Sequence, residues 1–526
     1  MGAHDVDKFG LKDHWRCLAA MTLVSVSTFQ YGLDFGVVSG LQAMVPFLQV
    51  FGYHDPLSPT GWNITSERQQ LISSLMTLGA FVTSATAGFT AVVFGRKTSL
   101  WVGCVLSVAA TIMMQVTASI GVLYAARLII GFANGIFMTH SQLWIFECSP
   151  ARYRGLGISA FCIWTSVGTL VGTIVDNFTS KNTDKSAYMI PLGVVYIAPG
   201  ILALGMFLIP ESPRWLLNKG EAGKAEKALR WLRPTGWNVS GELSEMKTAL
   251  EMERQLQSGV GVVDLFKNAI DRRRTLLSIG AVLCQAASGS MFMLAFGTYF
   301  FAIAGLSGSN FTTSPFEDSV ILIAVGVLAI LVNSAVVTRF GYRRVMLIAG
   351  MLLCGVCQLI IASVWQSAPF TTSSGNTVVA LSVIYMFFYN GCISTYAWVA
   401  GGEIPSQRLR SYTFGLATAV GFLGAWVTTF TAPYFINPAE LNWGPKYGYI
   451  WFGSCFLTAI WLFLYFPETK DRTLEEIDEM FGARVPARNF EGYQCHGAVG
   501  SSTFGSGDEK EREAKKMGNT VECAPA

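Results

Sequence analysis

Charged residues are scarce in this chain. Asp, Glu, Lys and Arg make up 13% of the 526 residues, whereas hydrophobic residues make up 52%. Soluble domains usually carry about 25% charged residues, so this composition excludes an ordinary soluble globule and predicts a polytopic membrane protein. The net charge is only +3, and the basic residues are spread among short loops. Nucleic-acid binding is therefore not indicated.

Several functional sequence features are also absent. The first 15 residues are polar and precede an apolar run long enough to span a bilayer, so we expect a retained N-terminal tail rather than a cleaved signal peptide. The sequence has no glycine-rich nucleotide loop and no cluster of metal ligands, which predicts a non-enzyme without a cofactor or metal. Most of the eleven cysteines lie within apolar runs, where cysteine usually acts as a small hydrophobic residue.

Long apolar runs are what the chain has in abundance. Six precede one long polar interruption and six follow it, and each is near the length of about 20 residues that a helix needs to cross a bilayer. We therefore predict an all-α membrane protein with twelve transmembrane helices in two six-helix bundles. The predicted spans are 17–44, 68–93, 99–118, 120–146, 153–176, 188–209, 275–303, 318–338, 345–366, 378–401, 411–436 and 448–466.

The polar interruption, from Pro210 to Arg274, divides the chain into domains. It contains EAGKAEKALRWLR, whose apolar residues recur at helical spacing and predict an amphipathic cytoplasmic helix. The stretch from Val485 to Ala526 lacks apolar periodicity, so we expect it to be disordered. The expected organisation is a cytoplasmic tail at 1–16, a first bundle at 17–209, a cytoplasmic helical linker at 210–274, a second bundle at 275–466 and a cytoplasmic tail at 467–526.

Basic residues gather in the loops on one side of the predicted spans. This bias assigns that side, and both termini, to the cytoplasm. The opposite loops contain few basic residues but several Asn-x-Ser/Thr sequons, which are acceptors for N-linked glycans on the outside of the membrane. The predicted glycosylation sites are Asn63, Asn177 and Asn310.

A weak internal repeat relates the two halves. FECSPARYRG follows the fourth predicted span and GGEIPSQRLRS follows the tenth, and related basic loops follow the second and eighth spans. Two such halves imply a substrate site between them near the bilayer midplane. The matching charges predict a cytoplasmic gate that closes the inner mouth, although simple anchoring of basic loops is an alternative for some of them. The predicted gate residues are Arg96, Glu147, Arg154, Arg343, Glu403 and Arg410.

Two ionisable residues lie deep within predicted spans. Asp34 is in the first span and Arg127 is in the fourth. An isolated charge in hydrocarbon costs roughly 2.5 kcal/mol or more, so we expect these two residues to pair. Such residues are functional by default, and the alternative is a static ion pair that only fixes packing. Gln30 lies one helical turn before Asp34, where it would contact substrate or tune the acid.

The motifs resemble those of the sugar porter branch of the major facilitator superfamily, particularly its fungal members. The resemblance rests on PESPRWL at 210–216, PETKDRTLEEIDEMF at 467–481, RLIIGFANG at 127–135 and an E-x-x-P motif with a following Arg-Gly pair at 147–155. It implies alternating access and a monosaccharide, disaccharide or polyol as substrate. In proton-coupled members an acid at the place of Asp34 pairs with the Arg of the fourth helix and binds the transported proton.

The sugar site departs from the family pattern. QAASGSM in the seventh span keeps Gln285 and Ser288, and Trp398 in the tenth span is also retained. The family carries an amide at four further positions where this chain has none, so the substrate is expected to be less hydroxylated than a common hexose. These positions hold Cys162, Ala286, Met291 and Gly421.

The predicted substrate-binding residues combine amides, a hydroxyl and aromatic rings on helix faces. Helix spacing aligns the group in the seventh span, and the tenth span adds an amide and an indole, although aromatic packing is an equally good explanation for Phe292. The set is Gln30, Gln285, Ser288, Phe292, Asn390 and Trp398.

The sequence thus predicts a secondary transporter of the plasma membrane that imports a sugar or sugar-like compound with protons. Its expected partners are a small-molecule substrate, protons and the lipid bilayer. One alternative is a facilitator or exporter of another metabolite, which the missing amides favour. Another is a non-transporting sugar sensor, which a long signalling tail would favour.

Overall fold

The computed structural model is almost entirely helical. It describes residues 10, 12–56, 61–150, 154–257, 263–305, 314–406, 408–470, 472 and 474–495.

The first half of the chain forms one helical bundle. α1 (Trp15–Leu41) bends by 82° into the short helix α2 (Val45–Phe51), which begins with Pro46 in its first turn. A two-residue antiparallel ladder follows, formed by β1 (Tyr53–His54) and β2 (Trp62–Asn63). The remaining helices of this half are α3 (Ser66–Phe94), α4 (Arg96–Val116), α5 (Ile120–Cys148), α6 (Arg154–Thr179), α7 (Ser186–Val194) and α8 (Ile197–Gly205).

Glycines allow α1 and α6 to pack in close contact. A Cβ atom at Gly32 would lie 1.8 Å from the backbone oxygen of Thr165, and one at Gly36 would lie 2.5 Å from that of Thr169. Gly168 and Gly172 of α6 lie similarly close to the backbone of α1. Small residues at a four-residue spacing are a common basis of helix association in membranes, because van der Waals packing replaces the missing hydrophobic drive.

Four helices link the two halves at one end of the bundle. The apolar face of α10 is buried through Ala225, Ala228, Leu229 and Leu232, so the predicted amphipathic helix is confirmed. The four helices are α9 (Pro213–Asn218), α10 (Ala222–Leu232), α11 (Val239–Gln257) and α12 (Asp264–Lys267).

The second half repeats the bundle with two breaks in its spans. The first break separates α13 (Ala269–Ala287) from α14 (Ser290–Gly305) at Gly289, whose φ of 85° favours glycine. The second is the π-helical turn η3 (Tyr389–Ser394) between α17 (Thr372–Phe388) and α18 (Thr395–Glu403). The other elements are α15 (Pro315–Phe340), α16 (Arg343–Ser367), α19 (Arg410–Ile436), η4 (Gly444–Tyr447), α20 (Gly448–Tyr465), α21 (Leu474–Gly482) and η5 (Ala487–Asn489).

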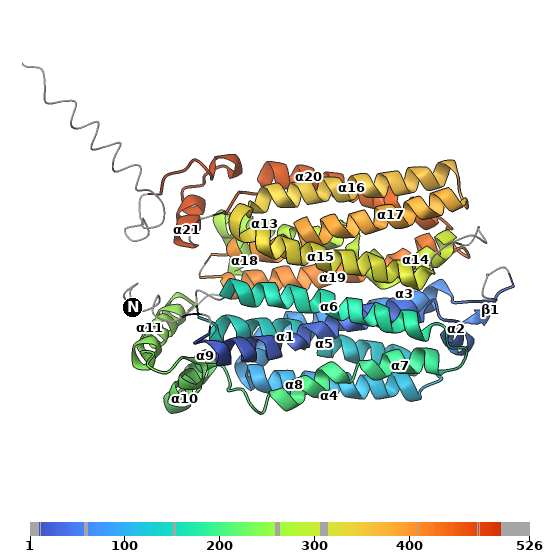
Figure 1. Cartoon of the computed structure of the whole chain (residues 1–526). Coiled ribbons are helices and arrows are strands. Elements are labelled where there is room, and N and C mark those ends of the chain that lie inside the picture. The colour runs from blue at the N-terminus through green and yellow to red at the C-terminus, as the bar shows by residue number, and fades with distance from the viewer. Residues whose placement is uncertain are drawn as a thin grey trace, which may run out of the picture.

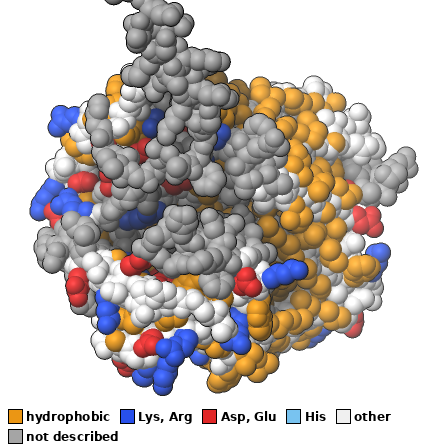
Figure 2. Space-filling model, turned by 60° about the vertical axis from the view of Figure 1, so that its left-hand side comes forward, with side chains coloured by type: hydrophobic (Ala, Val, Ile, Leu, Met, Phe, Trp, Pro, Cys, Tyr) orange, Lys and Arg blue, Asp and Glu red, His pale blue; other side chains and the backbone are white. Residues whose placement is uncertain are grey.

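The span prediction is confirmed. Within the described residues, eleven helices or helix groups are long and apolar enough to cross a membrane, and the bent pair of α1 and α2 makes twelve. In Figure 1 the linker helices and α21 lie at one end of the parallel helices, while α2 and β1 lie at the other. Figure 2 shows a broad hydrophobic band beside a region rich in charged side chains, as expected for a lipid-facing surface.

Two expected boundaries are wrong. α13 begins at Ala269, so Arg274 belongs to the seventh span rather than to the linker. The segment from Val485 to Cys495 is folded, because Phe490 is fully buried against the ring of Phe481. Arg273 also donates a hydrogen bond to the carbonyl of Val485. Residues 496–526 lie outside the described part of the chain.

Candidate functional site

A cavity lies between the two halves. Its volume of about 110 Å³ is several times the roughly 10–15 Å³ that one water molecule needs. The first half contributes α1, α5 and α6 to the wall, and the second half contributes α13, α14, α15, α18 and α19 together with η3. The halves meet at this level through the rings of Tyr31 and Phe422, whose centroids are 6.1 Å apart.

Three of the predicted substrate-binding residues line this cavity. They are Gln285, Asn390 and Trp398. The broken helix at Gly289 frees the carbonyl of Gln285, which accepts hydrogen bonds from Ser288 at 2.7 Å and Ser290 at 2.9 Å. The side-chain oxygen of Gln285 accepts a hydrogen bond from the Tyr389 hydroxyl at 3.4 Å. The break therefore fixes the position of Gln285 at the cavity wall.

The other three predicted residues lie away from the cavity wall. Ser288 is fully buried and uses its hydroxyl to cap the broken helix. Phe292 packs edge-on against the rings of Phe300 and Tyr447, so its aromatic packing explanation is the better one. Gln30 is fully buried in α1, and both of its side-chain polar atoms lack a hydrogen-bond partner among the described residues.

Several cavity residues were not among the predicted set. Most are hydroxyl or aromatic residues from both halves, and on α6 they recur at spacings of three and four. Helical spacing could have indicated this face, but α6 carries hydroxyl residues on other faces as well. The additional polar or aromatic wall residues are Tyr31, Phe161, Thr165, Ser166, Thr169, Tyr389, Ser394, Thr418 and Phe422.

The four positions that depart from the family pattern all line the cavity. Cys162, Ala286, Met291 and Gly421 form part of its wall. They present sulfur atoms, a methyl group or no side chain where an amide would offer both hydrogen-bond donors and an acceptor. The wall is consequently less polar at these positions than the family pattern would make it.

Asp34 and Arg127 form the predicted ion pair. The Nη1 atom of Arg127 lies 2.7 Å from Oδ1 of Asp34, and the side chains are 1% and 2% exposed. Arg127 also donates from Nε to the carbonyl of Ile72 at 2.8 Å. The second oxygen of Asp34 and Nη2 of Arg127 have no hydrogen-bond partner among the described residues. The pair is thus buried behind the cavity with part of its bonding capacity unused.

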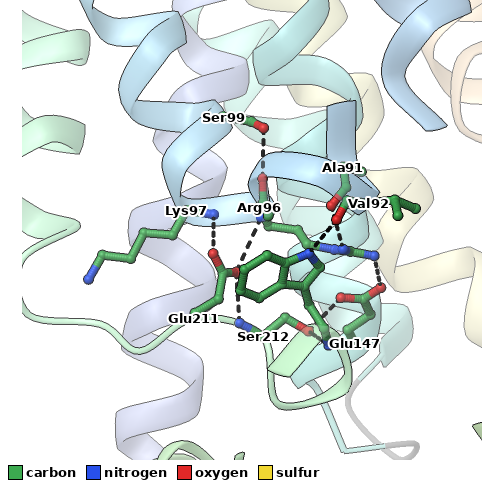
Figure 3. Close-up of polar contacts among 10 residues, drawn as sticks. Ala91, Val92, Arg96, Lys97, Ser99, Glu147, Glu211 and Ser212 are labelled. Carbon is green, nitrogen blue, oxygen red and sulfur yellow. Dashed lines mark hydrogen bonds and ion pairs between the residues drawn. The ribbon is translucent and has the colours of Figure 1, made fainter. Parts of the chain in front are cut away.

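A cluster of charges lies at the end of the first half that adjoins the linker helices (Figure 3). Arg96 contacts Glu147 at 2.6 Å, and the hydroxyl of Ser212 donates to the other oxygen of Glu147 at 2.5 Å. The carboxylate of Glu211 accepts the backbone N–H groups of Arg96 and Lys97 at the start of α4. A carboxylate is stabilised at a helix N-terminus, although burial raises the pKa of Glu211.

The second half contains the same cluster. Arg343 contacts Glu403 at 2.9 Å, and Thr469 donates to Glu403 at 2.7 Å. Glu468 accepts the backbone N–H groups of Arg343 and Arg344 at 2.8 and 3.0 Å, at the start of α16. The roles of Glu211, Ser212, Glu468 and Thr469 were not predicted, although the repeated Pro-Glu-Ser/Thr triplets at 210–212 and 467–469 were a sufficient signal.

Four of the six predicted gate residues are therefore paired within their own halves. Glu147 and Glu403 each bind an arginine from the loop after the second span of the same half. Arg410 donates to the carbonyl of Gly402 at 2.8 Å. Arg154 begins α6, and its side chain lies outside the described atoms.

Hydrogen bonds join the two halves at the opposite end, near α2 and β2. The hydroxyl of Ser39 lies 3.3 Å from that of Thr298, and Thr77 and Thr429 are paired at the same distance. Asn437 donates to the carbonyl of Ile64 at 3.2 Å. We call this set of contacts the outer seam. It closes the end of the bundle that the basic-residue pattern assigns to the outside.

The predicted glycosylation sites differ in accessibility. Asn63 is 8% exposed, its amide nitrogen donates to Asp55 and its oxygen accepts from Tyr299, so the geometry does not favour a glycan there. Asn177 is partly buried near the end of α6. Asn310 lies outside the described residues.

A family model described as "Sugar (and other) transporter" matches residues 20–481. The chain is 28% identical over 504 residues to the major facilitator-type transporter ecdD of Aspergillus rugulosus, covering 92% of this chain and 91% of that protein. It is 29% identical over 489 residues to maltose permease MAL61 of Saccharomyces cerevisiae, covering 91% of this chain and 78% of that protein. A partially occluded, inward-open structure of the xylose transporter XylE from E. coli is similar in fold, with a TM-score of 0.70 and 18% identity. The match covers 87% of this chain and 99% of XylE.

Proposed function

Because the chain belongs to the family of sugar (and other) transporters, we propose that it carries a sugar or sugar-like compound across the plasma membrane by alternating access. The observation that carries this proposal is the central cavity, whose wall combines Gln285, Asn390 and Trp398 with hydroxyl side chains from both halves. An amide and a hydroxyl can each donate and accept hydrogen bonds, and an aromatic face can cover the apolar side of a sugar ring. These are the side chains that a polyhydroxylated ligand requires.

Proton coupling is the second part of the proposal. The Asp34–Arg127 pair is buried, and one oxygen of the acid has no partner among the described residues. Protonation of Asp34 would remove the charge that Arg127 stabilises and so would change the energy of burying the arginine. Proton binding can in this way be linked to movement of α1 relative to α5.

The two cytoplasmic charge clusters support a gating role. In each half an arginine, a glutamate and a Pro-Glu-Ser/Thr triplet join the ends of several helices into one unit. We propose that these units move as rigid bodies and meet across the inner mouth when the outer seam opens. In the conformation described here the outer seam is formed, which corresponds to a carrier that faces the cytoplasm.

Growth and uptake in a yeast strain without its own hexose carriers test the function. The strain expressing this chain is offered monosaccharides, disaccharides, polyols and sugar acids, and uptake of the best substrate is measured with and without an uncoupler. We expect uptake of one of these compounds above its external concentration, and loss of accumulation with the uncoupler. Failure to accumulate any sugar-like compound by a chain that reaches the cell surface would contradict the proposal.

A second candidate is a carrier for a less hydroxylated metabolite, including one that moves outward. The observation that favours it is the cavity wall itself, where Ala286, Met291, Cys162 and Gly421 offer few hydrogen bonds. A sugar would forgo several hydrogen bonds there, each of about 1 kcal/mol. Loading the expressing cells with candidate compounds and measuring their efflux distinguishes this function from import.

A further inference from the structure

A second carboxylate is buried in the first bundle, apart from the Asp34–Arg127 pair. Asp176 lies in the last turn of α6, is 1% exposed, and has no hydrogen-bond partner for either oxygen among the described residues. An intramembrane acid of this kind is expensive to keep and therefore points to a function. The transport mechanism proposed above does not use it.

The surroundings of Asp176 disfavour a negative charge. Its carboxylate faces Gly40, where an added Cβ atom would lie 2.1 Å from Oδ2. Gly40 is in the last turn of α1, so the acid lies against the C-terminal ends of two helices. Helix C-termini carry partial negative charge and unpaired carbonyl groups. The backbone N–H of Gly40 also lies near the carboxylate, but neither oxygen makes a hydrogen bond to a described residue that would offset the burial of a charge.

Other ionisable groups do not compensate a charge on Asp176. The helices packed against α6 are α1, α5, α7 and α15. Asp34 and Arg127 are engaged with each other, and Glu317 accepts the backbone N–H of Ser314. Neither oxygen of Asp176 is bonded to any of these groups. The ionisable residues on the outer parts of these helices are Asp34, Tyr124, Arg127, Tyr188, Glu317 and Asp318.

The position of Asp176 connects it to the outer seam. Thr169 lines the central cavity, and Asp176 lies seven residues further along α6, on the same helix face towards the outside. Gly40, which Asp176 contacts, is next to Ser39 of the outer seam. α6 also packs against α15 of the second half, so separation of the two halves would change the surroundings of this outer part of α6.

We propose that Asp176 is a proton-binding site of the outer entrance, which is protonated when the outer seam is closed and ionised when it is open. Burial of an ionised carboxylate without partners is far more costly than burial of the neutral acid. Closure of the seam therefore requires a proton on Asp176, and high external pH favours the open entrance. The proposal rests on alternating access, but it does not require Asp34 to be the transported proton's site.

Cysteine labelling from the outside tests this site. The reporter is Thr173→Cys, because Thr173 is buried on the same face of α6 and its hydroxyl bonds only to Leu170 of its own helix. Cells expressing the full chain are treated with a membrane-impermeant maleimide across mildly acidic to mildly alkaline external pH. Maleimide reacts faster as the thiol ionises, so the informative quantity is the ratio of labelling rates between Asp176 and Asp176→Asn chains that both carry the reporter.

We expect the labelling rate of the Asp176 chain, divided by that of the Asp176→Asn chain, to rise by about 5- to 10-fold from acidic to alkaline external pH, because the open population of the Asp176 chain grows. Asp176→Glu should keep the rise, because it keeps a titratable acid. Asp34→Asn should also keep it, which separates this site from the proposed coupling residue. A ratio that stays constant with pH, at normal surface expression, would overturn the proposal.

Asp176→Ser provides a second neutral variant if Asp176→Asn fails to reach the surface. Its labelling rates are first divided by those of free cysteine at each pH, which corrects for ionisation of the reporter thiol. The corrected rate of Asp176→Ser should then be independent of pH. Retention of the full pH dependence in Asp176→Ser would equally overturn the proposal. Loss of the pH dependence in Asp34→Asn alone would assign the effect to Asp34 and leave the proposed function intact.

Discussion

The two bundles contribute different chemistry to the centre of the molecule. The first bundle holds a buried charge pair, Asp34 and Arg127, which lies off the cavity wall. The second bundle holds the amides that face the cavity and come from broken helices, Gln285 beside Gly289 and Asn390 in a π-helical turn, while the first bundle adds only hydroxyl, thiol and aromatic side chains from α1 and α6 to the polar part of the wall. If this division is correct, changes in the first bundle alter coupling, and changes in the second alter substrate affinity.

The largest effect is expected from Asp34→Asn. The amide keeps the shape of the acid but cannot release a proton, so accumulation against a gradient should be lost while exchange of substrate across the membrane persists. Breaking a buried pair costs about 3–5 kcal/mol, so surface expression is measured in parallel. The double variant Asp34→Asn with Arg127→Gln is the matched control, because it removes both charges.

The coupling and packing explanations of this pair give different results. If the pair only fixes packing, each single variant should fail to reach the surface and the double variant should restore normal accumulation. If Asp34 binds the transported proton, the double variant reaches the surface and still fails to accumulate substrate. Accumulation by Asp34→Asn that remains sensitive to an uncoupler would remove Asp34 from the coupling mechanism.

Hydropathy predicted the twelve spans because each long run must bury its backbone polar groups in a helix. It could not identify the cavity wall. α14, for example, has apolar residues on every side, so spacing does not distinguish the cavity-facing Leu294 from the packed Phe292. Gln285 and Trp398 were identified through the family resemblance. Asp176 was overlooked because its significance depends on Gly40, which is 136 residues away in the sequence.

In the second bundle, Trp398→Ala is expected to weaken substrate binding. Trp398 lines the cavity and lies 6.2 Å from the ring of Phe414, so its removal takes away aromatic surface without breaking an ion pair. The half-saturation concentration should rise about 3- to 10-fold, which corresponds to roughly 0.7–1.4 kcal/mol. Trp398→Phe is the control and should retain most of the affinity. An unchanged half-saturation concentration in Trp398→Ala would exclude Trp398 from the site.

The two charge clusters, one in each half, should respond equally to loss of their glutamates. Glu147→Gln and Glu403→Gln each leave a partly buried arginine with a weaker partner, at a cost of about 1.5–3 kcal/mol for a hydrogen bond to a charged group. If the clusters close the inner mouth, both variants favour the inward-facing state. Labelling of single cysteines at the inner ends of α5 and α18 by a cytoplasmic reagent should rise several-fold in each variant. An effect confined to one half would show that the clusters are structurally repeated but functionally different.

The smallest expected effect comes from restoring an amide to the cavity. Met291 lines the wall at a position where the family carries an amide, and Met291→Asn would offer a donor and an acceptor to a sugar hydroxyl. One added hydrogen bond is worth about 1 kcal/mol, so affinity for a fully hydroxylated hexose should improve about fivefold relative to a deoxy analogue. Met291→Leu keeps the size without the polar groups and should leave this ratio unchanged. Because the change is in the second bundle, the dependence of uptake on the proton gradient should be the same in both variants. A shift in coupling with Met291→Asn, or a hexose preference equal to that of Met291→Leu, would contradict the division between the two bundles.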